Sequence, residues 1–182
     1  MAKKHLLNIA LLIFVIIIML AFFEIGVRLF VPKNADFWEF KEDLPYLLKP
    51  NKIGKFVVEG EYVIKNSINS LGWHDKERKI EKSKKRIAVI GDSFVESLHV
   101  LPNETFTAHL DTFYPSIEVL NFGISDFSPR EEFVLLKNHV LEYDPDVVIL
   151  QLYLTNDVYG NNFELHRLVY GRSPAFDDDP DH

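Results

Sequence analysis

The most apolar stretch of the chain lies near its start. Leu6 to Phe23 is apolar at every position except Asn8. As a helix, this stretch rises about 27 Å, which is enough to cross the hydrocarbon core of a bilayer. A core helix of a small domain would keep a polar face, and this stretch has none. The pattern therefore predicts a transmembrane helix within residues 1–28, with residues 6–23 in the membrane.

The flanks of this stretch bear on its orientation. Lys3, Lys4 and His5 precede it, and positive charge before a first span holds that end in the cytoplasm. Ala21 to Phe23 is a poor match to the small-residue pattern of a signal-peptidase site. We therefore favour an uncleaved signal-anchor over a removed signal peptide. The expected location is a bacterial-type inner or plasma membrane, crossed once, with the rest of the chain extracytoplasmic.

The pattern from residue 29 to residue 85 is irregular. Three prolines break any long helix in it, namely Pro32, Pro45 and Pro50. Phe56 to Glu59 and Tyr62 to Lys65 read as two short strands of a hairpin. Lys76 to Lys85 is highly charged, which is typical of a solvated surface. We therefore predict a linker with a short hairpin, followed by an exposed boundary.

A regular pattern begins at residue 86. Three apolar runs are typical of buried parallel strands, namely Arg86–Ile90, Ile117–Asn121 and Val147–Tyr153. Between them, helices are predicted from Glu104 to Phe113, with Asn103 as a possible N-cap, and from Pro129 to about Tyr143. Ser128 to Glu131 spells a capping box. Strands alternating with helices at this spacing predict right-handed βαβ units and an α/β domain over residues 86–182.

Composition narrows the function classes. Hydrophobic residues make up 47% of the 182 and charged residues 26%, which is typical of a globular protein. Cysteine is absent, so disulfides and thiolate chemistry are excluded. The net charge of −7 argues against nucleic acid as a partner. The histidines show no zinc-ligand spacing, so no metal or cofactor is expected, and the sequence names no protein partner.

Polar residues follow each predicted strand. Gly91-Asp92-Ser93-Phe94 follows the first, Asn121 to Asp126 the second, and Leu154 to Asp157 the third. In open α/β sheets, ligands bind beyond the carboxyl ends of the strands. The Ser93 hydroxyl could attack a carbonyl there, while backbone N–H groups and the Asn156 amide hold the oxyanion. The structural alternatives are a helix-capping serine and a turn-stabilising asparagine.

These blocks resemble the SGNH, or GDSL-type, hydrolases. Gly91 to Phe94 looks like the first block of that family, with Ser93 as nucleophile, and Asn156-Asp157 looks like the third block, with Asn156 as an oxyanion donor. In the second block, Asp126 stands where the family has its oxyanion glycine. The resemblance covers about residues 56–176, including Ile68 to Trp73, and implies a partial three-layer flavodoxin-like sheet. Supporting roles are expected for Gly91, Asp92, Gly123 and Asp157.

The family takes its base from a late Asp-x-x-His block. The chain spells such a block at Asp179-Pro180-Asp181-His182. An aspartate-rich tail matches this spelling easily, and a terminal residue is usually too frayed to hold a base near a hydroxyl. Three sheet strands are also fewer than a doubly wound domain normally has. We therefore expect an N-terminal part of a longer protein, with negligible turnover by these 182 residues alone.

Three functions remain open at this stage, the weakest being a purely structural membrane-tethered domain. The first is a membrane-anchored serine esterase or O-acyltransferase that acts on ester-linked acyl groups of glycans, small molecules or lipids. The second is a non-catalytic anchored module that binds a carbohydrate or a protein through the same cleft.

Overall fold

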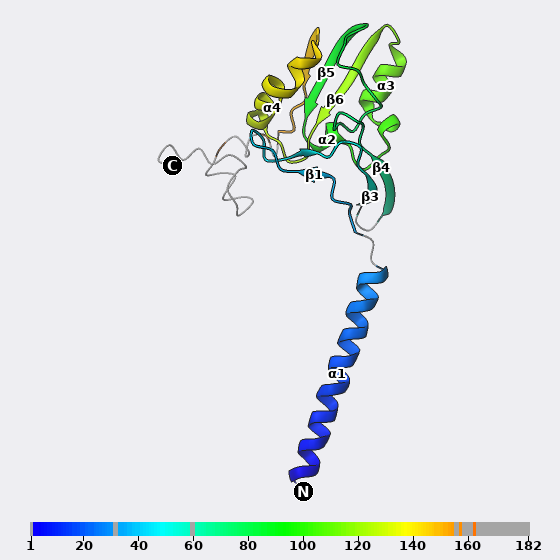
Figure 1. Cartoon of the computed structure of the whole chain (residues 1–182), viewed down its shortest axis with the longest axis vertical. Helices are drawn as coiled ribbons and strands as arrows, with labels where there is room; N and C mark the ends of the chain where they lie inside the picture. Colours follow the sequence, from blue (N-terminus) through cyan, green and yellow to red (C-terminus); the bar gives the residue numbers. More distant parts are fainter. Residues whose placement is uncertain (1, 31–32, 59–60, 155–156, 158–161, 163–182) are drawn as a thin grey trace. The chain divides into compact units, whose positions relative to one another are not determined.

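The structure is a computed structural model that describes residues 2–30, 33–58, 61–154, 157 and 162. The chain forms two compact units, Met1–Lys33 and Asn34–His182 (Figure 1). The first unit contains one helix. The second is a mixed α/β unit built on a small parallel sheet.

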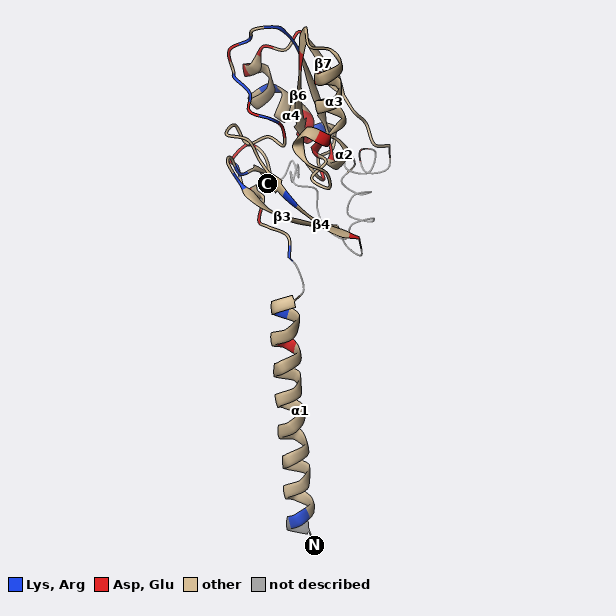
Figure 2. Ribbon diagram, turned by 90° about the vertical axis from the view of Figure 1, so that its right-hand side faces the viewer, with Lys and Arg blue, Asp and Glu red and all other residues tan. Residues whose placement is uncertain are grey.

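The first unit contains α1, which runs from Ala2 to Phe30. Its segment Lys4–Phe30 is long and apolar enough to cross a membrane, so the chain carries a candidate single-pass anchor, as the hydrophobic pattern predicts. In Figure 2, the charged residues of α1 lie only near its two ends. Near the second end, Glu24 and Arg28 form an ion pair of 2.7 Å one helical turn apart.

The sheet of the second unit has three parallel strands in the order β6-β5-β7. They are β5 (Lys85–Gly91), β6 (Ile117–Gly123) and β7 (Val147–Leu150). The predicted parallel sheet is thus confirmed, but the third strand ends three residues before the predicted Tyr153. As an edge strand, β7 leaves its four side chains 38–49% exposed, whereas a buried strand was expected.

The helices between the strands begin and end at identifiable caps. After η1 (Pro102–Glu104), α3 spans Phe106–Phe113 and is capped by the Thr105 side chain, which accepts a hydrogen bond from the Ala108 N–H at 3.2 Å. Asn103 is therefore not the N-cap. The helix α4 (Pro129–Leu135) continues as η2 (Leu136–Val140) and η3 (Leu141–Tyr143), to the predicted end.

The predicted capping box at the start of α4 is confirmed. The Glu131 carboxylate accepts a hydrogen bond from the Ser128 N–H at 2.9 Å. At the other end, Asp144 adopts a left-handed conformation with a φ of 49°, and Pro145 follows it. This pair stops the helix because a left-handed residue and a proline both interrupt the helical hydrogen-bond ladder.

Alternate residues of the strands face two separate cores. Ala88 and Ile90 on β5 face a core that includes Leu135, Val140 and Tyr143 from the α4 region. Val89 and Val119 face the opposite side and pack with Val95. Figure 1 shows α3 and α4 on the two sides of the sheet. This alternation is what a sheet covered on both faces requires.

The segment before the sheet packs into the same unit. It forms a small ladder, β1 (Trp38–Glu39) with β2 (Leu47–Leu48), and a hairpin, β3 (Ile53–Val58) with β4 (Tyr62–Ser67). The predicted hairpin is therefore present and longer than expected. Several side chains of the segment are buried, namely Phe37, Leu44, Leu47, Leu48, Ile68 and Trp73. The boundary predicted at residue 85 thus lies inside one packed unit.

The charged stretch from residue 76 to residue 85 lies at the amino ends of the strands. Most of it is exposed, as predicted, but the Arg78 side chain is only 5% exposed and binds Asp75 at 2.9 Å and Asp111 at 3.1 Å. Arg86, the second residue of β5, is buried and binds Glu118 at 2.8 Å. These ion pairs hold the stretch against the sheet, which composition alone did not indicate.

Candidate functional site

Ser93 lies at the carboxyl end of the central strand. After β5 ends at Gly91, the buried Asp92 accepts a hydrogen bond from the Phe94 N–H at 3.0 Å and caps the four-residue helix α2 (Ser93–Glu96). Ser93 is the first residue of this helix and is exposed, while Asp92 is the residue that caps it. The turn therefore presents the serine to solvent, as the strand-end position predicts.

The loop after β6 is tied to α2 by hydrogen bonds. The Asn121 side chain donates to the Val95 carbonyl oxygen at 2.8 Å and accepts from the Gly123 N–H at 2.9 Å. The Ile124 N–H donates to the Gly91 carbonyl oxygen at 3.0 Å. The loops that follow β5 and β6 are therefore held side by side at one edge of the sheet.

Gly123 allows this close approach. A Cβ atom on Gly123 would lie 2.0 Å from the Glu96 backbone nitrogen and 2.4 Å from the Val95 carbonyl carbon. Both atoms belong to the α2 backbone, which a side chain could not push aside cheaply. The absence of a side chain at residue 123 thus sets how near β6 comes to the helix that begins at Ser93.

Asp126 occupies an unusual backbone conformation in the same loop. Its φ is 61°, in the left-handed region that glycine adopts freely and aspartate tolerates better than most residues. Its side chain is exposed. The conformation at this position is therefore the one expected where a glycine is replaced by aspartate.

Glu96 is a buried carboxyl that sequence reasoning missed. It is 1% exposed. Its carboxylate accepts hydrogen bonds from the Trp38 indole N–H at 3.0 Å and from the Ser125 hydroxyl. Burial raises the pKa of Glu96 to about 7. This one side chain connects the Ser93 helix to the loop that carries Asp126 and to β1.

The third loop is described only in part. The Gln151 N–H donates to the Ile90 carbonyl oxygen at 2.9 Å, so the chain leaves β7 beside the end of β5. Asp157 is buried, and its carboxylate accepts a hydrogen bond from the Tyr153 N–H at 2.5 Å. Burial raises the pKa of Asp157. The other predicted residues, Asn156, Asp179 and His182, lie outside the described residues.

Glu132 is a second buried carboxyl that the sequence did not reveal. It lies on α4 and is 1% exposed. Within the described residues, neither of its oxygen atoms has a hydrogen-bond partner, and the same is true of one oxygen of Gln151 and one of Asp157. Burial, followed by the negative charges of Asp157 and Asp92, raises the pKa of Glu132 to about 8. At neutral pH this carboxyl is therefore largely protonated.

Glu132 should make the stability of the fold depend on pH. The folded-state pKa of Glu132 lies above its ordinary value of 4.5, so the fold loses stability as the pH rises from that value towards about 8. Glu132→Gln removes this cost, and we expect its free energy of unfolding at pH 7 to exceed that of the parent by about 2 kcal/mol. The gain should vanish near pH 4. Urea unfolding at several pH values measures it, with Glu142→Gln on the exposed surface as control. Parallel pH profiles for parent and Glu132→Gln would contradict the assignment.

The described histidines make no hydrogen bond to the Ser93 hydroxyl. His74 is buried, with Nδ1 2.6 Å from the Glu96 carbonyl oxygen and Nε2 2.7 Å from Asn66 Oδ1. His139 lies 2.8 Å from an Asp43 carboxylate oxygen. His99 and His109 are exposed. Among the described residues, no group of three histidine, aspartate or glutamate side chains is arranged to hold a metal ion.

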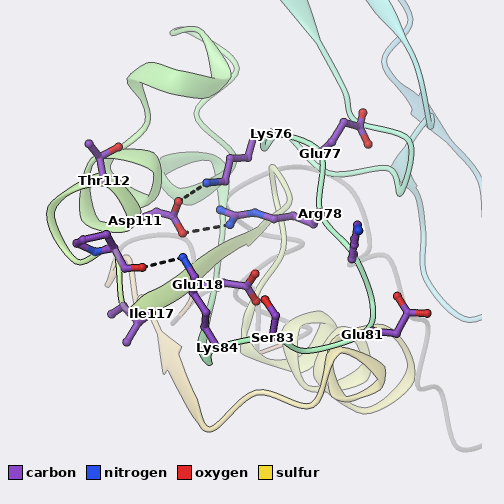
Figure 3. Close-up of a pocket in the computed structure, with 12 residues that line it drawn as sticks. Lys76, Glu77, Arg78, Glu81, Ser83, Lys84, Asp111, Thr112, Ile117 and Glu118 are labelled. Carbon is purple, nitrogen blue, oxygen red and sulfur yellow. Dashed lines mark hydrogen bonds and ion pairs between the residues drawn. The ribbon is translucent and has the colours of Figure 1, made fainter.

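Two cavities lie at opposite ends of the sheet. One of about 380 Å³ adjoins Ser125 and Asp126 and is lined by Trp38, Phe40 and Tyr46. The other, of about 440 Å³, lies at the amino ends of the strands and is shown in Figure 3. In Figure 3, Lys76 and Arg78 both point to Asp111, and Lys84 binds the Pro115 carbonyl oxygen. Each of these three cationic side chains already has a partner within the protein. We therefore interpret the second cavity as part of the packing of the fold and not as a binding site.

No family model matches the sequence, and no curated protein matches it significantly. The site therefore has to be interpreted from its own geometry.

Proposed function

We propose that the chain is part of a membrane-anchored serine esterase or O-acyltransferase of the SGNH type. The observation that carries the proposal is the position of Ser93. It is exposed at the carboxyl end of the central strand, directly after a Gly-Asp turn whose aspartate caps the next helix. Its helix is tied to the loop in which Asp126, at the position of the family's oxyanion glycine, has a left-handed backbone conformation that glycine adopts freely.

The strand order is consistent with the fold that this family uses. If β5, β6 and β7 are numbered 1, 2 and 3 along the chain, their order across the sheet is 2-1-3. A doubly wound flavodoxin-like sheet begins with the same order. In such sheets, ligands bind outside the carboxyl ends of the strands. Ser93 and Asp126 both follow strand ends at this edge, which supports a common site for them.

The proposed reaction is acyl transfer through Ser93. The serine oxygen attacks an ester carbonyl carbon, and a histidine takes the serine proton and returns it to the leaving alcohol. The Ser93 and Asp126 N–H groups and the Asn156 side chain stabilise the oxyanion. Water or an acceptor hydroxyl then takes the acyl group from Ser93. In the family that the chain resembles, the base is the histidine of a late Asp-x-x-His block. Asp179 and His182 match this spelling, but a frayed terminal residue is a poor base, so His182 is tested separately below.

The test is ester hydrolysis by the natural gene product. The substrates are p-nitrophenyl acetate and p-nitrophenyl decanoate, and the comparison is Ser93→Ala. Equal rates for the two proteins would remove Ser93 as the nucleophile. His182→Ala, measured in parallel, shows whether the terminal block supplies the base.

The proposed location is the outer side of a bacterial-type inner or plasma membrane. The basic residues Lys3 and Lys4 precede the apolar stretch of α1, which favours a cytoplasmic N-terminus and an extracytoplasmic α/β unit. We expect protease added to intact spheroplasts to degrade this unit. Its complete protection, with degradation only after lysis, would reverse the orientation.

A second function has one observation in its favour. The described residues place no base at the Ser93 hydroxyl, while a cavity lined by aromatic residues adjoins the loop that carries Asp126. An anchored carbohydrate- or protein-binding module would need the cavity and not the base. It would show ligand binding with no Ser93-dependent hydrolysis.

A further inference from the structure

The cavity beside Asp126 is built from two parts of the chain far apart in sequence. Its lining residues come from the β1 region and from the loop after β6, and they are Asp36, Trp38, Glu39, Phe40, Tyr46, Ser125 and Asp126. Its volume of about 380 Å³ falls within the range of about 300–1,000 Å³ typical of small-molecule sites. The cavity therefore adjoins the loop that faces the Ser93 helix.

Contacts with the rest of the protein fix the orientation of two of its three aromatic rings. The Trp38 indole N–H donates to Glu96 at 3.0 Å, and the Trp38 ring meets Phe37 edge-on, with centroids 6.2 Å apart. The Tyr46 hydroxyl donates to the Ser125 carbonyl oxygen at 2.7 Å. Both rings are therefore oriented before any ligand arrives, which lowers the entropic cost of binding.

The third ring is uncovered. Phe40 is 90% exposed, although the Trp38 and Tyr46 rings beside it are half-buried. A phenylalanine in this position contributes little to folding, since most of its surface stays in water. Exposed aromatic side chains next to a cavity are typical of binding sites.

The polar groups of the cavity restrict the ligand. Three carboxylates line it, on Asp36, Glu39 and Asp126, and a carboxylate can only accept hydrogen bonds. The ligand must therefore bring donors. Lys49 pairs with Asp36, and Lys41 pairs with Glu39 at 2.7 Å. These pairs weaken the attraction for a cation, while the carboxylates repel an anion.

A ligand that fits has an apolar face for the rings and hydroxyl donors along its edge. A neutral pyranose has both, because its C–H groups form the face and its hydroxyl groups the rim. An alkyl chain fits the rings but takes water away from the carboxylates and offers them no hydrogen-bond donor in return. A uronic acid carries a carboxylate of its own, which the carboxylates of the cavity would repel.

We propose that this cavity binds a neutral pyranose unit of a glycan beside the Ser93 site. As a substrate subsite, it rests on the proposed esterase or acyltransferase function and identifies the ester carrier as a neutral glycan.

The test uses tryptophan fluorescence, because the chain has only two tryptophans. Trp38 lines the cavity, whereas Trp73 is buried and donates to the Tyr143 hydroxyl at 2.8 Å. The full chain is placed in lipid nanodiscs, which avoids sugar-headed detergents, and is titrated with chitotriose, trigalacturonate and decanoate. We expect chitotriose to give a saturable change in emission that Trp38→Phe abolishes. Trigalacturonate and decanoate should bind more weakly.

Phe40→Ala is the decisive variant because it removes an exposed ring and leaves the fold intact. Its affinity for chitotriose should fall about tenfold. Phe113→Ala, which removes a 77% exposed ring from α3, is the matched control and should bind like the parent. No saturable change with chitotriose, equal affinity in Phe40→Ala, or preference for trigalacturonate or decanoate would each overturn the proposal.

Both assays, carried out on the natural gene product, separate this proposal from the proposed reaction. Hydrolysis of p-nitrophenyl acetate needs no sugar. Ser93-dependent hydrolysis without chitotriose binding would reject the subsite and retain the esterase. Chitotriose binding without Ser93-dependent hydrolysis would retain the sugar site and favour the binding module.

Discussion

Ser93→Ala is expected to lower kcat/KM for p-nitrophenyl acetate by at least about a thousandfold, towards the residual catalysis that oxyanion donors and binding alone provide. The reason is that alanine leaves no oxygen to form the acyl intermediate, while the turn that holds residue 93 is unaffected. Asp92, not Ser93, caps α2, so the loss of the hydroxyl removes no described hydrogen bond of the fold. The rate should therefore fall without a fall in stability.

Ser83→Ala provides the control for this substitution. Ser83 is exposed and lines the charged cavity at the other end of the sheet, so its removal should leave both rate and stability unchanged. Comparable hydrolysis by Ser93→Ala and the parent would leave residue 93 a simple surface serine of α2.

Gly123→Ala should have the largest effect on stability. The added methyl group would meet two backbone atoms of α2, at 2.0 Å and 2.4 Å, and neither can rotate away. Strand β6 and α2 must then separate, which breaks the packing of Asn121 against Val95. We expect the free energy of unfolding to fall by about 3 kcal/mol or more. Chemical denaturation followed by circular dichroism measures the loss.

The same substitution at Gly26 separates a steric effect from a general effect of alanine. A Cβ atom on Gly26 has nothing within 4 Å, so Gly26→Ala should leave the unfolding of the α/β unit unchanged. Gly123→Ala should also lower any Ser93-dependent rate by more than the unfolded fraction explains, because α2 carries Ser93. An unchanged midpoint of unfolding would show that α2 can move aside.

The elements with local signals were the ones that sequence predicted well. The strands at Arg86 and Ile117 are short, mainly apolar runs, and the capping box at Ser128 is a short-range pattern, so each can be seen in a few neighbouring residues. The apolar helix α1 has the same property. The end of β7 was not predicted, because Leu152 and Tyr153 continue the apolar pattern after pairing with β5 has ended at Leu150.

The packing of the segment before the sheet could not be predicted in the same way. Trp73 meets Tyr143 seventy residues later, and Trp38 meets Glu96 across fifty-eight. Contacts of this range leave no periodicity in the sequence. Glu96 and Glu132 were missed for the same reason, since a glutamate in a helix is usually solvated and only the tertiary structure shows that these two are buried.

The sequence predicted where Ser93 and the loop after the second strand lie, but not which contacts hold them together. The strand-end rule placed Ser93 and the second loop at one edge, and the structure describes both there. What the rule could not provide is the way the loop is held, which depends on Asn121 and Glu96 and on the close approach at Gly123. Asn156, Asp179 and His182 remain predictions.

The carboxylate of Glu96 binds the Trp38 ring of the aromatic cavity and belongs to the helix that begins at Ser93. A ligand that shifts Trp38 therefore acts on the same short helix as a group attached to Ser93. By thermodynamic linkage, any such effect is reciprocal. If a sugar changes the equilibrium for acylation of Ser93 by some factor, acylation changes the affinity for that sugar by the same factor. If both proposals hold, the buried carboxyl of Glu96 links the two sites, and one coupling free energy describes the effect of each on the other.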